Sequence, residues 1–284
     1  MLYNPRMARF LFWNTYKRDL TEQIVRLCHD YDVDVLILAE NGAEDSKIVE
    51  WLNRGVERQY FALYPQFDRI TFIHRYPEFC FEPLFKEPQM SSFSVPNILL
   101  RPPTGDEILL VAIHLPSKLY AENSDQEYYS RETMNEIRFF EAERGHKRTV
   151  VVGDFNMNPF ETGLTAFDAF HSVMDRRIVL KEQRSIRNND STFFYNPMWR
   201  LMGNSVDNPP GTHYYNKSRM DELFWHTFDQ VLIRPSLVKH FDEESLSIVC
   251  STGGDSLADK NGRPDKMKFS DHFPLFFQMN IETI

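Results

Sequence analysis

The fold is decided by residues 149–156, which read Thr-Val-Val-Val-Gly-Asp-Phe-Asn. The run Thr149–Val152 is short, rich in β-branched residues and free of charge, as expected of a strand that is buried on both faces. Gly153 and Asn156 supply the backbone freedom that a turn needs. Because α/β folds display their ligand groups where strands end, Asp154 and Asn156 are candidates for a functional site.

Other apolar runs along the chain adjoin polar side chains in the same way. The runs cover residues 8–13, 33–39, 108–115, 228–233 and 273–279. Charged and amide groups beside buried strands need water, a partner or a metal, because burying them unpaired is costly. Singly, each could be a solvated loop residue, a turn residue, a helix cap or a satisfied core histidine. The polar residues are Asn14, Glu40, His114, Asp271 and His272.

Helices and further strands are expected between these runs. Apolar residues at helical spacing between 20 and 31 predict one helix. Ser124 and Glu127 form a capping-box pattern, which predicts a long polar helix to about residue 143. Between 60 and 101, short apolar runs punctuated by prolines indicate antiparallel strands and loops. This mixture favours two packed sheets flanked by helices.

The composition is that of an ordinary globular protein. The chain has 284 residues, 42% of them apolar, and 24 phenylalanines that can fill a sizeable core. No segment approaches the roughly 18 to 20 apolar residues needed to cross a bilayer, and residues 1–9 show no secretory signal. Cys28, Cys80 and Cys250 are scattered and form no zinc pattern. We therefore expect one cytoplasmic domain over 1–284, without membrane insertion.

The net charge of −9, from 32 basic and 41 acidic residues, does not by itself indicate a polyanionic partner. Local patches steer such a partner more than the total charge does. Two basic stretches stand out, at Arg144–Arg148 and Arg176–Arg187. They could contact nucleic acid or form a solvated surface. The acidic excess would fit carboxylates gathered around a metal.

Residues 183–227 are polar, rich in Asn and studded with aromatic residues and prolines. This composition predicts a long loop region or a small insertion, and such loops usually carry specificity. The aromatic residues could stack on exposed bases or form a small satellite core under the loop. They are Phe193, Phe194, Tyr195, Trp199, Tyr214, Tyr215, Phe224 and Trp225.

As an ordered set, the polar motifs resemble the endonuclease/exonuclease/phosphatase superfamily. This group holds pancreatic-type deoxyribonuclease, abasic-site endonucleases, neutral sphingomyelinases and inositol-polyphosphate 5-phosphatases. Its most specific motifs are Gly-Asp-Phe-Asn at 153–156 and Ser-Asp-His at 270–272, in this order. The resemblance spans residues 13–272 and implies an α/β fold, a four-layer α/β/β/α sandwich with two packed mixed sheets. The other matches are Trp13-Asn14, Glu40, His114-Leu115 and Phe228-Asp229.

The resemblance implies a metal site. Glu40 would be the direct ligand of a divalent cation, and Asn14 and Asp271 would complete the set of ligands. Mg²⁺ suits such oxygen donors and usually keeps several waters, and Mn²⁺ could replace it. One-metal and two-metal mechanisms both stay open.

The resemblance also implies catalytic roles. His272 would be the catalytic histidine, and Asp229 would hydrogen-bond its ring, which fixes the tautomer and favours the charged form. Asp154, oriented by Asn156, would hold or deprotonate the attacking water. His114 would contact the phosphate or assist the leaving oxygen. Either Asp154 or His272 could be the general base.

Some positions depart from the common family pattern. Ala39 stands where many relatives carry Gln before the metal-binding Glu, and Gln230 stands where many carry Tyr after the Asp that matches Asp229. His114 stands where abasic-site endonucleases usually carry Tyr, and it is closer to the deoxyribonuclease, sphingomyelinase and inositol-phosphatase branches.

We therefore expect a Mg²⁺-dependent phosphoesterase that hydrolyses phosphodiester bonds, with a nuclease acting on DNA or RNA as the first hypothesis. The alternative is a phosphatase or phosphodiesterase on a small phosphate ester or a lipid headgroup. A catalytically inactive binding module is a third hypothesis, which the complete set of competent side chains disfavours. The basic stretches and loop aromatics favour nucleic acid, and the lack of a basic amphipathic helix argues against lipid. The sequence leaves the oligomeric state open.

Overall fold

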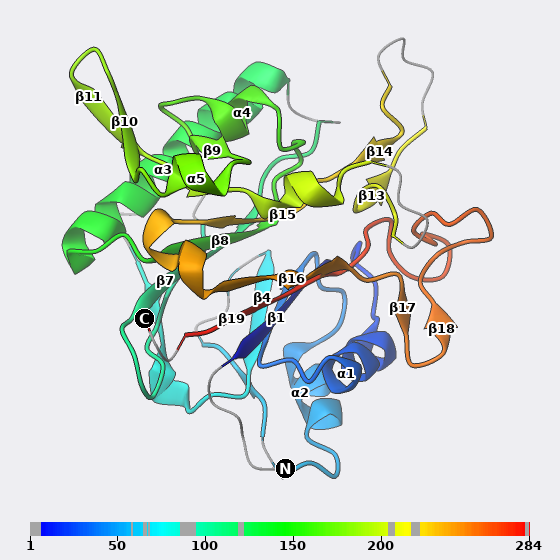
Figure 1. The fold of residues 1–284 in the computed structure, drawn as a ribbon. Helices are drawn as coiled ribbons and strands as arrows, with labels where there is room; N and C mark the ends of the chain where they lie inside the picture. Colours follow the sequence, from blue (N-terminus) through cyan, green and yellow to red (C-terminus); the bar gives the residue numbers. More distant parts are fainter. Residues whose placement is uncertain are drawn as a thin grey trace.

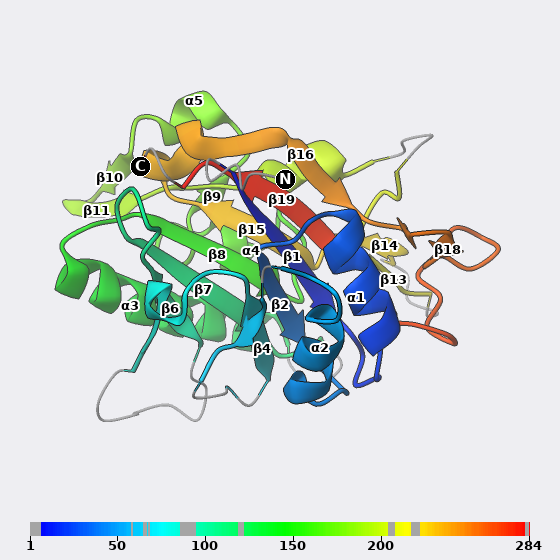
Figure 2. The same cartoon turned by 90° about the horizontal axis from the view of Figure 1, so that it is seen from below.

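The computed structural model describes residues 7–57, 59–64, 67, 69–85, 95–118, 122–203, 208–216, 222–281 and 284. In this part of the chain, strands form two large mixed sheets that pack face to face (Figure 1). Helices α1 (Thr21–Asp30) and α2 (Asp45–Leu52) cover the outer face of one sheet, and α3 (Asn123–Arg144) covers that of the other (Figures 1 and 2). The expected four-layer α/β/β/α sandwich is confirmed.

The first sheet is built around a parallel pair, β1 and β2, which helix α1 connects. Every residue of β2 is buried, because the strand lies between two layers, and this explains its unbroken apolar sequence. The remaining strands pair antiparallel. In order across the sheet, the strands are β16 (Phe241–Ile248), β19 (Leu275–Met279), β1 (Ala8–Asn14), β2 (Val35–Ala39), β4 (Ile70–His74) and β3 (Phe61–Ala62).

The second sheet has a similar plan around the parallel pair β7 and β8, which α3 connects, but its strands β12 and β9 also pair in parallel. The expected antiparallel strands between 60 and 101 are present on both sheets, and residues 86–94 of that region lie outside the described residues. In order across the sheet, the strands are β5 (Phe81–Leu84), β6 (Asn97–Leu100), β7 (Ile108–His114), β8 (Thr149–Asp154), β15 (Asp229–Ile233), β12 (Phe194–Tyr195) and β9 (Ser172–Val173).

Apolar cores fill the spaces between the layers. The core between the sheets includes Phe10 and Phe277, whose rings stack at 4.9 Å. A second core lies under α1 and α2, and a third lies under α3. Full burial of one such aromatic side chain contributes about 1.5–3 kcal/mol, so these cores supply most of the drive to fold. The residues of α3 that were expected to face the core do so, namely Met134, Ile137 and Phe140.

Helix α3 begins slightly earlier than its capping pattern suggests. The capping box joins Glu122 and Asp125, not Ser124 and Glu127, and the first helical residue is Asn123. A carboxylate at the N-cap can accept the same backbone hydrogen bond as a serine hydroxyl, so the two overlapping patterns compete for one helix start.

Residues 183–227 hold more regular structure than a long loop. Strand β12 joins the second sheet, so Phe193, Phe194 and Tyr195 are buried in the cores. Segments 204–207 and 217–221 lie outside the described residues. The small hairpins here and beyond pair β10 (Gln183–Ile186) with β11 (Asn189–Thr192), β13 (His213–Tyr214) with β14 (Trp225–His226), and β17 (Ser251–Thr252) with β18 (Asp255–Ser256).

Short helical turns complete the described elements. They are α4 (Thr162–Thr165), α5 (Arg176–Val179), and the 3₁₀ turns η1 (Glu78–Cys80), η2 (Pro197–Leu201) and η3 (Pro235–His240). No helix in the described part combines the length and apolarity that crossing a bilayer requires. All three cysteines are free, and burial raises the pKa of the Cys28 thiol to about 12.

The strand register brings residues that are distant in sequence to one edge of the sandwich. In the first sheet, Asn14 pairs with the residue that precedes Glu40. In the second, His114 pairs with Asp154, and Asp154 pairs across the other side with Asp229. Since β1, β2, β7 and β8 all end at this edge, their terminal side chains can meet.

Candidate active site

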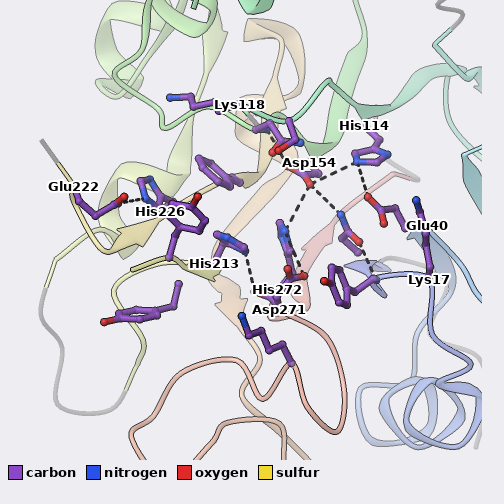
Figure 3. A pocket seen from close by; sticks show the side chains of 18 residues that line it. Lys17, Glu40, His114, Lys118, Asp154, His213, Glu222, His226, Asp271 and His272 are labelled. Carbon is purple, nitrogen blue, oxygen red and sulfur yellow. Dashed lines mark hydrogen bonds and ion pairs between the residues drawn. The ribbon is translucent and has the colours of Figure 1, made fainter. Parts of the chain in front are cut away.

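A cavity of about 580 Å³ opens at this edge (Figure 3). It is lined by residues from both sheets and from the loop before β19, and nearly all of the expected site residues are among them. Asp229 lies behind His272 and is fully buried. Side chains from residues 14 to 272 therefore converge at one place. The expected residues in the lining are Asn14, Glu40, His114, Asp154, Asn156, Asp271 and His272.

Several residues that line the cavity have a strained backbone. Tyr16, Lys17, Glu40 and Asn156 have φ between 47° and 56°, a left-handed conformation that is rare for residues other than Gly. The Lys17 N–H donates to the Glu40 carbonyl at 2.8 Å, so two of the strained turns hold each other. Such strain persists only where the surrounding structure imposes it, and it concentrates at functional sites.

His272 is held firmly by its neighbours. Its Nδ1 lies 2.8 Å from Asp229 Oδ2, and its carbonyl accepts a hydrogen bond from Trp13 Nε1 at 2.9 Å. Burial by itself would lower the pKa of His272, but the carboxylates of Asp229 and Asp154 outweigh it and raise the pKa to about 10. The ring is therefore held as an imidazolium, with Nε2 3.8 Å from Asp154 Oδ2.

Asp154 lies at the centre of the cluster. Its Oδ1 accepts the Asn156 backbone N–H at 2.9 Å, and its Oδ2 accepts from Asn14 Nδ2 at 3.0 Å. Asn156 thus orients Asp154 through its backbone, while its side chain donates to a backbone carbonyl at the end of β7. The Nε2 atoms of His272 and His114 lie 3.8 and 3.9 Å from Oδ2, too far for direct hydrogen bonds.

Gly153 is required by strand packing as well as by its own backbone conformation, whose φ is 152°. It lies within β8, and a Cβ at this position would meet the Ile113 carbonyl oxygen at 2.0 Å. Any larger residue would push β7 and β8 apart. The glycine therefore allows His114 and Asp154 to lie side by side at the strand ends.

His114 contacts the expected metal ligand. Its Nε2 lies 3.3 Å from Glu40 Oε1, and its Nδ1 is buried without a hydrogen-bond partner among the described residues. A buried N–H without an acceptor is costly, so the proton belongs on Nε2, which donates to Glu40. This hydrogen bond lowers the pKa of Glu40 and outweighs the opposing effect of burial. Glu40 therefore stays ionised.

Asn14, Glu40 and Asp271 offer oxygen donors to the cavity, and their chemistry fits a hard divalent cation. Asp271 Oδ1 is buried and has no hydrogen-bond partner among the described residues. Burial raises the pKa of Asp271, and the carboxylates of Asp154 and Glu40 raise it further. Asp271 Oδ1 lies 4.0 Å from His272 Nε2 and makes no hydrogen bond among the described residues, so a cation would stabilise it further.

Two groups of histidine and carboxylate atoms are compact enough to hold a metal ion. In the part of the chain that the structure describes, they are His213, Asp271 and His272, and Asp154, Asp229 and His272, each with ligand atoms within 4.8 Å of one another. Glu40 belongs to neither cluster. The expected ligands Asn14, Glu40 and Asp271 all line the same cavity.

One wall of the cavity was only partly predicted from the sequence, since His213, Glu222 and His226 were not singled out. Opposite Glu40, the hairpin β13–β14 and the residues beside it contribute rings and one carboxylate (Figure 3). The available signal was the run Thr-His-Tyr-Tyr at 212–215, inside the region expected to carry specificity. Lysines at 17, 118 and 266 also line the cavity. The wall residues are His213, Tyr214, Tyr215, Glu222, His226 and Phe228.

The basic stretches noted in the sequence lie away from the cavity. Arg144 and Arg148 both bond to Glu107, near the start of β8, whereas the cavity lies at the other end of that strand. The hairpin β10–β11, which carries Arg184, projects on the side away from β13–β14 (Figures 1 and 2). Neither stretch belongs to the described lining of the cavity, so the nearby cations are the three lysines.

The structure resembles solved structures over nearly its whole length. It is similar to truncated Caenorhabditis elegans TDP2, with 13% identity, 96% of this chain and 98% of that chain covered, and a TM-score of 0.57. It is also similar to the 3′ phosphatase NExo from Neisseria bound to a product DNA hairpin, with 11% identity, coverage of 96% and 99%, and a TM-score of 0.54. It is similar as well to an AP endonuclease from Archaeoglobus fulgidus, with 14% identity, 96% of this chain and 100% of that chain covered, and a TM-score of 0.51.

At these identities the likeness shows the shared fold alone. A search of curated proteins found no match to the sequence. A family model, however, matches residues 11–272, which extend from β1 to the end of the Ser-Asp-His motif. The chain therefore belongs to the Endonuclease/Exonuclease/phosphatase family, whose members are hydrolases that act on phosphoesters.

Proposed function

We propose that this protein is a Mg²⁺-dependent phosphodiesterase that cleaves nucleic acid, with Mn²⁺ as a substitute cation. The observation that carries the proposal is the convergence of the His272–Asp229 pair, Asp154 and the carboxylates of Glu40 and Asp271 on one cavity. Phosphodiester hydrolysis needs a group that takes the water's proton, positive charge at the phosphoryl oxygens, and help for the leaving oxygen. These side chains can supply each of them.

Asn14, Glu40 and Asp271 are the proposed ligands of the cation. A bound Mg²⁺ would neutralise charge on the phosphoryl oxygens as the transition state forms. The hydrogen bond from His114 keeps the pKa of Glu40 low, so this ligand is ionised before the cation arrives. Asn14 also donates to Asp154, and it thereby connects the proposed metal ligands to the proposed base.

Asp154 is the proposed general base. Its two oxygens accept hydrogen bonds from Asn156 and Asn14, which aim the carboxylate at the cavity. His272 has its pKa raised to about 10 and already holds a proton, so it suits the role of a positive donor to a phosphoryl oxygen. Asp229 keeps this ring in place through Nδ1. His114 is the proposed contact to the phosphate or the leaving oxygen.

Nucleic acid is the preferred substrate for two reasons. The Neisseria 3′ phosphatase, of the same fold, was solved with a product DNA hairpin, and zebrafish TDP2 was solved with a single-stranded DNA product. In this chain, Lys17 and Lys266 line the cavity without a carboxylate partner among the described residues, and Lys118 pairs with Glu161. Such amines attract the phosphates that flank a scissile bond.

A small phosphate ester is the second candidate, and the shape of the site supports it. The volume of the cavity, about 580 Å³, lies in the range of pockets that hold compact ligands. A polymer would have to place one nucleotide into this pocket. An inactive binding module is disfavoured, since the competent side chains meet in one place.

A substrate screen tests the proposal. Purified protein with Mg²⁺ is offered single- and double-stranded DNA, RNA, nucleotides, inositol phosphates and sphingomyelin, with His272→Ala as the control. The proposal expects cleavage of DNA or RNA that needs Mg²⁺ and that the variant loses. Turnover of a small phosphate alone would replace it with the second candidate. No metal-dependent turnover of any substrate would favour the inactive module.

A further inference from the structure

The cavity has two chemically different sides. On the side of Glu40 are the carboxylates and histidines assigned above, whereas Glu222 and His226 lie on the opposite side (Figure 3). A phosphate bound near His272 leaves this second side for the organic part of the substrate. We call it the ring-lined lobe, formed by His213, Tyr214, Tyr215, Glu222, His226 and Phe228.

The protonation of His226 follows from its neighbours. Asn158 is buried, and its Oδ1 accepts the Thr227 N–H at 3.0 Å, so its Nδ2 faces His226. Because Nδ2 can only donate, His226 Nδ1, at 3.1 Å, must accept. The ring proton therefore sits on Nε2, which donates to Glu222 Oε1 at 3.0 Å. Burial lowers the pKa of His226, which agrees with a neutral ring.

Glu222 is consequently fixed at one oxygen only. Its Oε1 accepts from His226 Nε2 and from the Phe224 N–H at 3.1 Å, while Oε2 has no donor among the described residues. The side chain is only 7% exposed, and it lines the cavity. A carboxylate so removed from water gains most from a ligand that brings hydrogen-bond donors, and it repels a phosphate. Glu222 thus selects for the part of a substrate that carries N–H or O–H groups.

The lobe offers flat surfaces between His272 and Glu222. The ring of His213 lies 4.5 Å from that of His272 and 5.4 Å from that of Phe228, and Phe228 stacks on His226 at 4.7 Å. The interplanar angles at Phe228 are 24° and 23°, so the rings of His213 and His226 stack on Phe228, and a planar group could extend this stack. Aromatic faces of this kind hold planar groups by stacking.

We propose that Glu222 determines specificity by accepting hydrogen bonds from the amino group of a nucleobase seated in the ring-lined lobe. The inference deepens the proposed function and rests on it for the position of the phosphate. A planar base would stack on the rings, its amino group would donate a hydrogen bond to Glu222 Oε2, and its own phosphate would reach His272. Bases that lack the amino group leave a buried carboxylate oxygen without a donor, which is the costly arrangement that gives discrimination.

The test compares ligands that differ by one amino group. Binding is measured by calorimetry with phosphonate analogues of guanosine and inosine monophosphate, and with those of adenosine and purine riboside monophosphate, because phosphonates are not hydrolysed. We expect the wild type to bind the amino-bearing member of at least one pair about 10- to 100-fold more tightly. Glu222→Gln keeps an oxygen for His226 and Phe224 but places an NH₂ group toward the ligand, so it should abolish the difference.

Glu244→Gln is the matched control, since it removes the same charge from a side chain that is 88% exposed on β16. This variant should retain the discrimination. Equal binding within both pairs by the wild type would overturn the inference, and so would an equal loss for all ligands in Glu222→Gln, which would mean a structural role alone. Amino-dependent binding by a protein that cuts no nucleic acid would keep the inference and refute the proposed function. Cleavage of nucleic acid without amino-dependent binding would keep the proposed function and refute the inference about Glu222.

Discussion

The Nδ1 atom of His272 lies 2.8 Å from Oδ2 of Asp229, and both side chains are almost completely buried. The pair joins the loop before β19 to the first residue of β15, so it connects the two sheets at the edge where the cavity opens. Two buried ionisable groups are expensive unless each stabilises the other. Their persistence at a cavity wall is the pattern of a site arranged for chemistry.

Replacement of Asp229 by Asn should lower kcat by about 10²–10⁴-fold with little change in KM. The amide cannot stabilise the charged imidazole, and it removes the main reason that the pKa of His272 is raised. Steady-state kinetics on the best substrate of the screen checks this, and circular dichroism verifies the fold. Loss of kcat together with a lost fold would be uninformative, so Asp229→Glu serves as a second variant that retains the charge. Full activity in Asp229→Asn would refute the assigned role.

Glu40→Gln should raise the Mg²⁺ concentration needed for half-maximal rate. The substitution keeps the shape of the side chain but removes the charge that attracts the cation. Its matched control is Glu44→Gln, which changes a glutamate at the N-cap of α2 that does not line the described cavity. The metal titration is followed by initial rates. Overlapping titration curves for wild type and Glu40→Gln would exclude Glu40 as a ligand.

The buried pair of Arg234 and Glu141 should be needed for stability. Its atoms meet at 2.8 and 3.0 Å, the side chains are 2% and 3% exposed, and the guanidinium lies 3.9 Å from the Phe194 ring. Glu141→Leu should cost about 3–5 kcal/mol, because it leaves a buried cation unpaired. The double variant with Arg234→Met should recover much of this loss. Urea unfolding measures both, and a double variant as unstable as the single one would contradict the pairing argument.

Stability should fall as the pH drops from about 6.5 to about 4, in part because of His74. Burial lowers the pKa of His74 to about 4, and the hydrogen bond to the Tyr76 carbonyl opposes this only partly. Below pH 6.5 the unfolded chain takes up a proton that the folded chain resists, so acid favours unfolding. Between pH 7 and pH 5 the expected loss is about 1–2 kcal/mol.

His74→Phe isolates this contribution. The ring can still stack on Phe81, which lies 4.1 Å from the His74 ring, but it cannot bind a proton. The difference in unfolding free energy between wild type and variant should therefore change with pH in the stated window. A difference that stays constant from pH 7 to pH 5 would show that His74 does not titrate as described.

The strands at the centre of each sheet were predictable, because burial on both faces demands unbroken apolar runs such as Val35–Ala39 and Thr149–Val152. Strand β16 was missed, since this edge strand reads Phe-Asp-Glu-Glu-Ser-Leu-Ser-Ile and is half exposed, with a register shift. Strand β12 is only Phe194–Tyr195, too short for any period to show. Such elements are made by tertiary pairing and not by local pattern.

The site was predictable where polar residues end buried strands. Asn14, Glu40, His114 and Asp154 fall at such ends, and the sheet register brings them together. The wall that holds Glu222 was not predictable, because a carboxylate in a polar, Asn-rich stretch looks like any solvated residue. Its role shows only when His226 and the cavity are seen beside it. The packing role of Gly153 was not predictable either, since only the packed structure shows how closely the Ile113 carbonyl approaches it.

The catalytic role of His272 is tested by kcat of His272→Ala, measured with Mg²⁺ on the best substrate beside a thermal melt of the same sample. His272 is the residue on which Asp229, Asp154 and Asp271 all act. We expect a folded variant whose kcat is lower by about 10²–10⁴-fold. A folded variant with nearly wild-type turnover would contradict this role.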